Sequence, residues 1–151
     1  AWVAAAGLGA TVVSGGVWVR GRVLELERSV AAVRDTLAFV RGPHTRAVHI
    51  PVTTGGRPGS VTIFVDSRRH RWLVRCENLA PNAPDEAYQL WFVTDAGVRR
   101  AELMPMDTDE PMITVLEMPR EGPPVRGAAM TVEPRAGSTE PRGPTVFRRL
   151  L

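Results

Sequence analysis

The first part of the chain is an uninterrupted run of apolar residues. Residues 1–19 contain no charged side chain before Arg20, and a helix needs about 20 predominantly apolar residues to cross a bilayer. Trp2 and Trp18 stand near the two ends of this run, about 24 Å apart on a helix that rises ~1.5 Å per residue, where indole rings suit the membrane interfaces. The pattern therefore predicts a transmembrane helix over residues 1–19, with the lipid bilayer as a partner.

A secretory signal peptide and a buried core helix are the two alternatives for this run. Nothing before it supplies the basic segment of a signal peptide, and a helix that is apolar on all sides is hard to bury in a small protein. Because the sequence starts inside the apolar run and without Met, we expect it to be a fragment of a longer chain. Arg20 and Arg22 taken alone favour a cytoplasmic side for the residues that follow.

Residues 20–42 predict a helical stalk. Apolar residues recur there at spacings of 3, 4, 3, 4 and 3, which is the seam of about three heptads. The seam residues are Val23, Leu26, Val30, Val33, Leu37 and Val40. Gly42 and Pro43 end the helix, since Gly suits a helix C-cap and Pro cannot continue the helix. The seam fits a coiled-coil homodimer and fits equally well a helix packed along its own domain.

Residues 43–151 predict an all-β domain. Short runs of β-branched and aromatic residues alternate here with Gly, Pro, Asn and Asp. The expected strands are Ala47–Val52, Val61–Asp66, Trp72–Asn78, Tyr88–Thr94, Ala101–Met104, Met112–Met118, Ala128–Glu133 and Thr145–Arg148. About seven or eight strands at this rhythm are typical of an antiparallel β-sandwich. The Pro- and Gly-rich stretch 134–144 is expected to be an ordered connection packed across the domain.

Charge and composition narrow the classes of partner. The chain has 19 basic and 16 acidic side chains and a net charge of +3, and every basic residue other than the three histidines is Arg. Such a small excess, with acidic residues interspersed, argues against a nucleic-acid partner. The single cysteine, Cys76, excludes an intrachain disulfide and a multi-cysteine metal site.

The sequence offers little catalytic chemistry. No nucleophile motif, phosphate-binding loop or metalloprotease helix is present, and Cys76 lacks the neighbouring His and Met of a copper-binding loop. An acidic turn at Asp107, Asp109 and Glu110 lacks the glycine and distal glutamate of a calcium loop, so a solvated turn is the simpler interpretation. We therefore expect no enzymatic activity, no cofactor and no metal.

Two motifs carry a resemblance to a known family. The first is Tyr88-Gln89-Leu90-Trp91, followed by Phe92-Val93 and a short turn, and the second is Thr131-Val132-Glu133-Pro134, followed by Gly137-Ser138. Together they resemble the core strand and the closing signature of the C-terminal domain of the anti-sigma-K factor (RskA) family. Because side chains of a strand alternate between two covered faces of a sandwich, we interpret these residues as determinants of the fold rather than as a ligand site.

The resemblance implies a function. It implies the extracytoplasmic sensory and regulatory part of a single-pass membrane anti-sigma factor, located in the cell membrane. An N-terminal cytoplasmic region absent from this chain would bind an extracytoplasmic-function sigma factor. The regulator would then be cut stepwise, by a site-1 type protease and by an intramembrane protease. This orientation outweighs the contrary signal of Arg20 and Arg22.

One connection is a candidate for the proteolysis-sensitive linker. It consists of Arg41, Gly42, Pro43, His44 and Thr45, which join the predicted stalk to the first strand, and proteolysis concentrates at accessible, unpaired backbone. The competing function is a membrane-tethered β-sandwich that binds cell-wall polymer or a partner protein. An exposed aromatic row across one sheet would favour that alternative.

Overall fold

The computed structural model describes residues 25, 27–31 and 33–151. The predicted transmembrane helix, with Trp2 and Trp18, lies outside these residues. Within them, no helix combines the length and apolar character that a membrane crossing requires. The chain divides into two compact units, of which the second, Gly42–Leu151, contains all eight strands.

Part of the predicted stalk is helical in the described residues. Residues 25, 27–31 and 33–40 are helical, and the backbone leaves the helix at Arg41, whose N–H donates to the Leu37 carbonyl oxygen at 2.9 Å. The four described seam residues are exposed: Val30, Val33, Leu37 and Val40. The helix thus ends before Gly42 and Pro43, as their residue types indicated.

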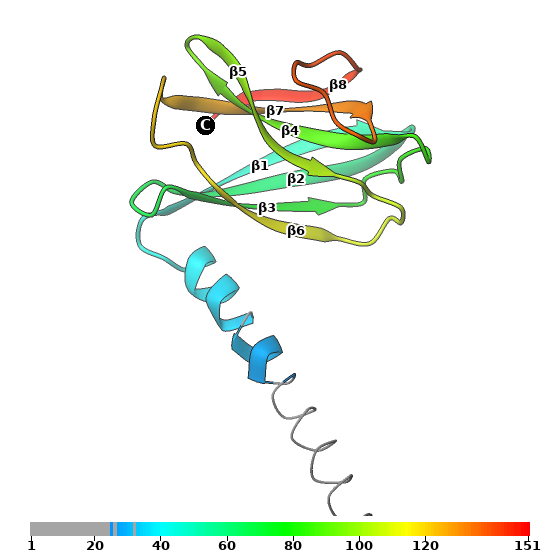
Figure 1. Ribbon diagram of the computed structural model, residues 1–151. Helices are drawn as coiled ribbons and strands as arrows, with labels where there is room; N and C mark the ends of the chain where they lie inside the picture. Colours follow the sequence, from blue (N-terminus) through cyan, green and yellow to red (C-terminus); the bar gives the residue numbers. More distant parts are fainter. Residues whose placement is uncertain (1–24, 26, 32) are drawn as a thin grey trace, which may run out of the picture. The chain divides into compact units, whose positions relative to one another are not determined.

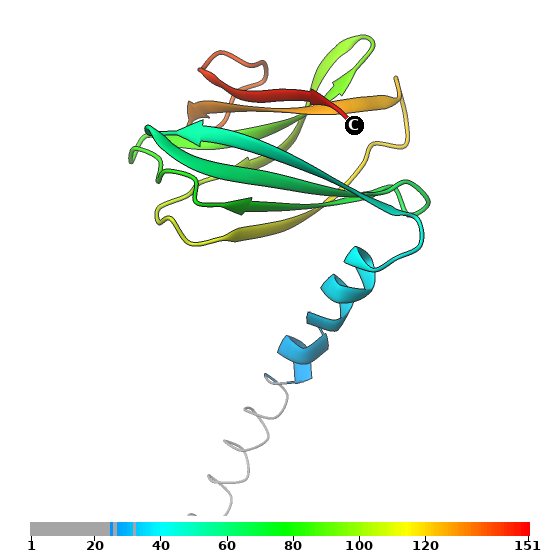
Figure 2. The ribbon, with the colours of Figure 1, turned by 180° about the vertical axis from the view of Figure 1, so that it is seen from behind.

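Two antiparallel four-stranded sheets face each other, which confirms the predicted sandwich (Figures 1 and 2). One sheet has the strand order β1-β2-β3-β6 and the other β5-β4-β7-β8. The strands are β1 Thr45–Thr54, β2 Arg57–Asp66, β3 Arg71–Glu77, β4 Glu86–Thr94, β5 Gly97–Met104, β6 Met112–Glu117, β7 Val125–Pro134 and β8 Thr145–Leu150. All eight expected strands are present, and several begin earlier than the apolar pattern indicated.

The early start of β2 has a local explanation. Gly55 and Gly56, with φ values of 55° and 73°, form a two-residue turn that joins β1 to β2, and such turns require the left-handed backbone that glycine adopts readily. Pro58 pairs with Thr53 of β1, whereas pairing with β3 begins only at Ser60. Pro58 therefore lies where β2 has a single neighbour, which is the position that tolerates a missing N–H.

Alternation along β4 separates two buried clusters. Tyr88, Leu90 and Phe92 pack between the two sheets, in the main core. Trp91 and Val93 point to the other face of the sheet and form a second cluster. The connection between β7 and β8 lies on this outer side of the β5-β4-β7-β8 sheet (Figure 1), so the predicted packing of this stretch across the domain is confirmed. Both faces of β4 are covered as a result, and every residue from 87 to 94 is buried.

Candidate functional site

The carboxylate of Glu133 joins the second family motif to the connection that follows it. Glu133 lies near the end of β7 with only 1% of its surface exposed. Its Oε1 accepts from the Thr131 hydroxyl at 2.6 Å and from the backbone N–H groups of Arg142 at 2.9 Å and Gly143 at 3.1 Å. Its Oε2 accepts from the Ser138 hydroxyl at 2.7 Å. Four donors therefore satisfy a buried carboxylate without a cation among the described residues.

The first motif is bonded to the same network. Gln89 exchanges two hydrogen bonds with the Ser138 backbone, donating through Nε2 at 2.9 Å and accepting through Oε1 at 2.8 Å. The indole Nε1 of Trp91 donates to the Thr131 hydroxyl oxygen at 2.9 Å. Thr131 in turn donates to Glu133, so Trp91, Thr131 and Glu133 form one chain of hydrogen bonds. The two motifs thus form a single buried polar network on the outer face of the sheet.

This network controls the ionisation of Glu133. Burial by itself raises the pKa of the carboxyl, because it removes water from the charged form. The hydrogen bonds from Thr131, Ser138, Arg142 and Gly143 outweigh that effect and hold the pKa below its ordinary value. The Glu133 side chain is consequently charged, and its two oxygens are held by the four hydrogen bonds described above. A proton-transfer role would require the opposite direction of shift.

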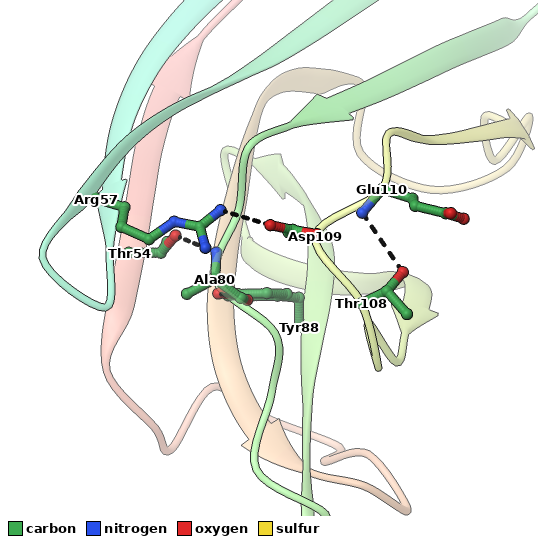
Figure 3. Close-up of polar contacts among 7 residues, drawn as sticks. All are labelled: Thr54, Arg57, Ala80, Tyr88, Thr108, Asp109 and Glu110. Atoms are coloured by element: carbon green, nitrogen blue, oxygen red, sulfur yellow. Dashed lines mark hydrogen bonds and ion pairs between the residues drawn. The ribbon is translucent and has the colours of Figure 1, made fainter.

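Tyr88 is anchored from the inner face of β4 at one end of the sandwich (Figure 3). Its hydroxyl donates to the Ala80 carbonyl oxygen at 2.8 Å, and the Ala80 N–H donates to the Thr54 hydroxyl at 2.8 Å. These two bonds tie the strand to the connection before it and to the end of β1. Leu90, the remaining residue of the first motif, is fully buried in the main core. The structure therefore brings Gln89 and Trp91 to one face of β4, and Tyr88 and Leu90 to the other.

Ion pairs engage two side chains of the acidic turn. Asp109 lies 3.3 Å from Arg57 (Figure 3), and Asp107 accepts two hydrogen bonds from Arg135 at 2.9 and 3.1 Å. The bonds and charge of Arg135 lower the pKa of Asp107. Among the described residues, no group of three or more His, Cys, Asp or Glu side chains could hold a metal ion.

Cys76 and His70 lie in positions that indicate a structural role. Cys76 is buried in the core, and desolvation raises the pKa of its thiol to about 12, so the reactive thiolate is scarcely populated. His70 lies in the β2–β3 turn with a φ of 53°, as expected for a hairpin tip, and its carbonyl accepts from the Met118 N–H at 2.7 Å.

The candidate linker forms a turn. Arg41, Pro43 and His44 are exposed, and the Thr45 N–H donates to the Gly42 carbonyl oxygen at 3.0 Å. A protease binds its substrate as an extended strand whose backbone is free to pair. This turn would therefore have to open before cleavage.

Sequence reasoning identified the motif residues but not the network that unites them. Ser138 belonged to the family signature, yet the bonds of Ser138 and Gly143 to Glu133 depend on a ten-residue connection folding back on β7. Thr131 and Glu133 share one face of a strand because they are two residues apart. A carboxylate at such a position, on a face expected to be covered, is the signal that indicates buried donors nearby.

Comparison with known proteins identifies a family and two relatives of this chain. Residues 1–146 match the family model described as anti-sigma-K factor rskA, C-terminal. The chain is 31% identical over 108 residues to an anti-sigma-K factor RskA of Mycolicibacterium vanbaalenii, covering 72% of this chain and 43% of that protein. It is 34% identical over 91 residues to an uncharacterized protein in the phr 5′ region of Streptomyces griseus, covering 58% of this chain and 35% of that protein.

The matched part of the chain thus spans less than half the length of these two relatives. No solved structure shows a significant match. The family is one of anti-sigma factors, which are regulators. Because the family model matches residues 1–146, which include both motifs of the buried network, this chain belongs to the C-terminal family of the anti-sigma-K factor RskA.

Proposed function

We propose that this chain is the extracytoplasmic regulatory part of a single-pass membrane anti-sigma factor, together with its membrane anchor. The family match over residues 1–146 carries the proposal. An N-terminal cytoplasmic region outside this chain would bind an extracytoplasmic-function sigma factor and keep it inactive. Residues 1–19 would cross the membrane with Trp2 and Trp18 at its interfaces, residues 20–42 would form the stalk, and residues 43–151 the outer domain.

The folded sandwich would control when the regulator is cut. The linker Arg41–Thr45 carries exposed residues next to β1, and its turn is closed by the bond from Thr45 to Gly42. Loss or rearrangement of the sandwich would release this turn as extended backbone, which a site-1 type protease accepts. An intramembrane protease would then act on the shortened chain and free the sigma factor.

Deleting residues 46–151 from the full-length protein should raise sigma-dependent transcription several-fold, because the linker Arg41–Thr45 is then kept without the sandwich that would protect it. The measurements are a sigma-dependent reporter and an immunoblot of the regulator over time. Arg57→Gln, which removes one exposed ion pair, is the matched control and should leave both readouts at the wild-type level. Unchanged transcription together with unchanged turnover in the deletion strain would show that the sandwich does not control cleavage.

The stalk is proposed to pair with a second copy of itself. Val30, Val33, Leu37 and Val40 lie on one seam and are exposed, and burial of such a seam is the driving force of a coiled coil. Val33→Glu combined with Leu37→Glu should abolish dimer crosslinking of the full-length protein in membranes, whereas Arg34→Gln, off the seam, should not. Equal crosslinking of all three proteins would contradict a dimer through this seam.

The alternative, a tethered polymer-binding module, lacks the feature that would favour it. The large exposed hydrophobic side chains of the described residues are aliphatic, and those on the sandwich are Ile113 and Val115 of β6 and Leu150 of β8. No exposed aromatic row therefore crosses either sheet within residues 43–151. The regulatory proposal is the better supported of the two.

A further inference from the structure

A cavity opens between the two sheets at one end of the sandwich. Its volume is about 390 Å³, within the range of small-molecule sites. The β2–β3 turn, the β6–β7 connection and the C-terminal end of the chain lie at this same end (Figures 1 and 2). Apolar side chains supply much of its wall, among them Val65, Met118 and Val125, and none of the residues that line it is acidic.

Trp72 contributes to the wall of this cavity and brings an unsatisfied donor. The residue is 1% exposed, and its ring packs edge-on against Phe92 with centroids 4.9 Å apart. Its indole Nε1 is the one buried side-chain nitrogen or oxygen among the described residues that has no hydrogen-bond partner. Buried donors are nearly always paired in native proteins, so an orphan at the wall of a cavity indicates a missing acceptor.

Positive charge lies around the same cavity. Arg46 of β1 and Arg120 of the β6–β7 connection both line it, and neither has an ion-pair partner among the described residues, in contrast to Arg69 and Arg71 of the nearby hairpin. A guanidinium fork binds a carboxylate through two parallel hydrogen bonds. The cavity therefore combines two unpaired cations, one neutral donor and an apolar wall.

We propose that this cavity binds a small aliphatic carboxylate. The carboxylate accepts from the Trp72 indole N–H and pairs with Arg46 or Arg120, while the hydrocarbon part packs against the apolar wall. A phosphate ion would pair with the same guanidinium groups but would leave the apolar wall uncovered, so the hydrocarbon part is what favours the aliphatic acid. The same chemistry is found in a free short-chain acid and in the apolar C-terminus of a peptide, and binding of either would give the outer domain a chemical input.

The indole N–H resonances of the 151-residue chain provide the test. Titration with hexanoate should shift the Trp72 signal and leave that of Trp91 unchanged, because Trp91 already donates to Thr131. Trp72→Phe and Trp91→Phe assign the two signals. Arg46→Gln combined with Arg120→Gln, which leaves the core intact, should weaken binding at least about tenfold, the scale of one lost charge-assisted contact, whereas Arg57→Gln should not.

The arms of the titration separate the outcomes. An N-acetylated dipeptide with a free apolar C-terminus that shifts Trp72 more strongly than hexanoate identifies a peptide source, and the reverse order identifies a free acid. Hexanol and inorganic phosphate are the negative controls. The proposal is overturned if Trp72 does not respond to either carboxylate, if hexanol or phosphate shifts it equally, or if the double arginine variant binds as well as the wild type.

Discussion

Replacing Glu133 with alanine is expected to lower the free energy of unfolding of the sandwich by about 4 kcal/mol. The substitution removes the acceptor of four hydrogen bonds and leaves the Thr131 and Ser138 hydroxyls and two backbone N–H groups without it. Each donor left unsatisfied in a buried site costs about 1–3 kcal/mol, reduced where the connection relaxes and admits water. Urea unfolding, followed by tryptophan fluorescence, measures the loss.

Two variants control this experiment. Glu140→Ala removes an exposed glutamate from the same connection and should change the free energy of unfolding by less than about 0.5 kcal/mol. Glu133→Gln keeps the shape but turns one acceptor oxygen into a donor, so an intermediate loss of about 2 kcal/mol is expected. Glu133→Ala and Glu140→Ala unfolding at the same urea concentration would contradict the role given to the network.

The stability of the wild type and that of Glu133→Gln are expected to depend differently on pH. The pKa of Glu133 is lowered in the folded protein, whereas an unfolded glutamate titrates near about pH 4.3. The unfolded chain therefore takes up the proton first, so the stabilisation is fully present above about pH 4.3 and is lost as pH falls through the folded pKa. Glu133→Gln has no such proton, and its stability should decline less over this acid range. The contribution of Asp107, which is also shifted downward, cancels in the comparison.

Gly143→Ala is expected to cost about 3 kcal/mol, the second largest effect. A Cβ at this position would overlap the carbonyl oxygen of Val132. The Cβ is bonded directly to the backbone and the oxygen belongs to it, so neither can move aside as the end of a flexible side chain would. The Val132 N–H also donates to the Pro144 carbonyl oxygen at 2.9 Å, which fixes the connection against β7 at this point. The alanine variant would push the connection outward and weaken the bond from residue 143 to Glu133.

Gly56→Ala is the matched control for this steric argument. Gly56 has a φ of 73° and open space where its Cβ would be, so alanine there meets only the backbone strain of about 1 kcal/mol. Unfolding in urea should rank the wild type first, Gly56→Ala second and Gly143→Ala last. Equal losses for the two variants would mean that close packing of the connection does not matter.

The apolar pattern predicted the strands because it records burial, and burial is what the sandwich satisfies. Val61, Ile63 and Val65 alternate in the sequence and all lie in the core. The pattern missed the first residues of β2, since Arg57, Pro58 and Gly59 are not apolar and pair only through their backbone with β1. Backbone pairing leaves no trace in side-chain hydropathy when a tight turn enforces it.

The sequence indicated which residues form the buried network but not which hydrogen bonds join them. Gln89, Trp91 and Glu133 stand out by motif, but the donors to Glu133 include backbone groups of Arg142 and Gly143, whose residue types carry no such information. The cavity beside Trp72 was not anticipated either, because its lining comes from parts of the chain that lie far apart in the sequence. Contacts of this kind depend on topology rather than on local spacing.

The position of the Glu133 donors along the chain has a consequence for biosynthesis. Ser138, Arg142 and Gly143 follow β7, so a nascent chain that has emerged only as far as Pro134 presents a buried-type carboxylate with none of these three donors. Sheet β5-β4-β7-β8 cannot complete its outer layer until residue 143 has left the ribosome. Folding of this sheet therefore waits for the connection that follows β7, and a molecule whose synthesis stops before residue 143 would reach the quality-control machinery as an unfinished sheet.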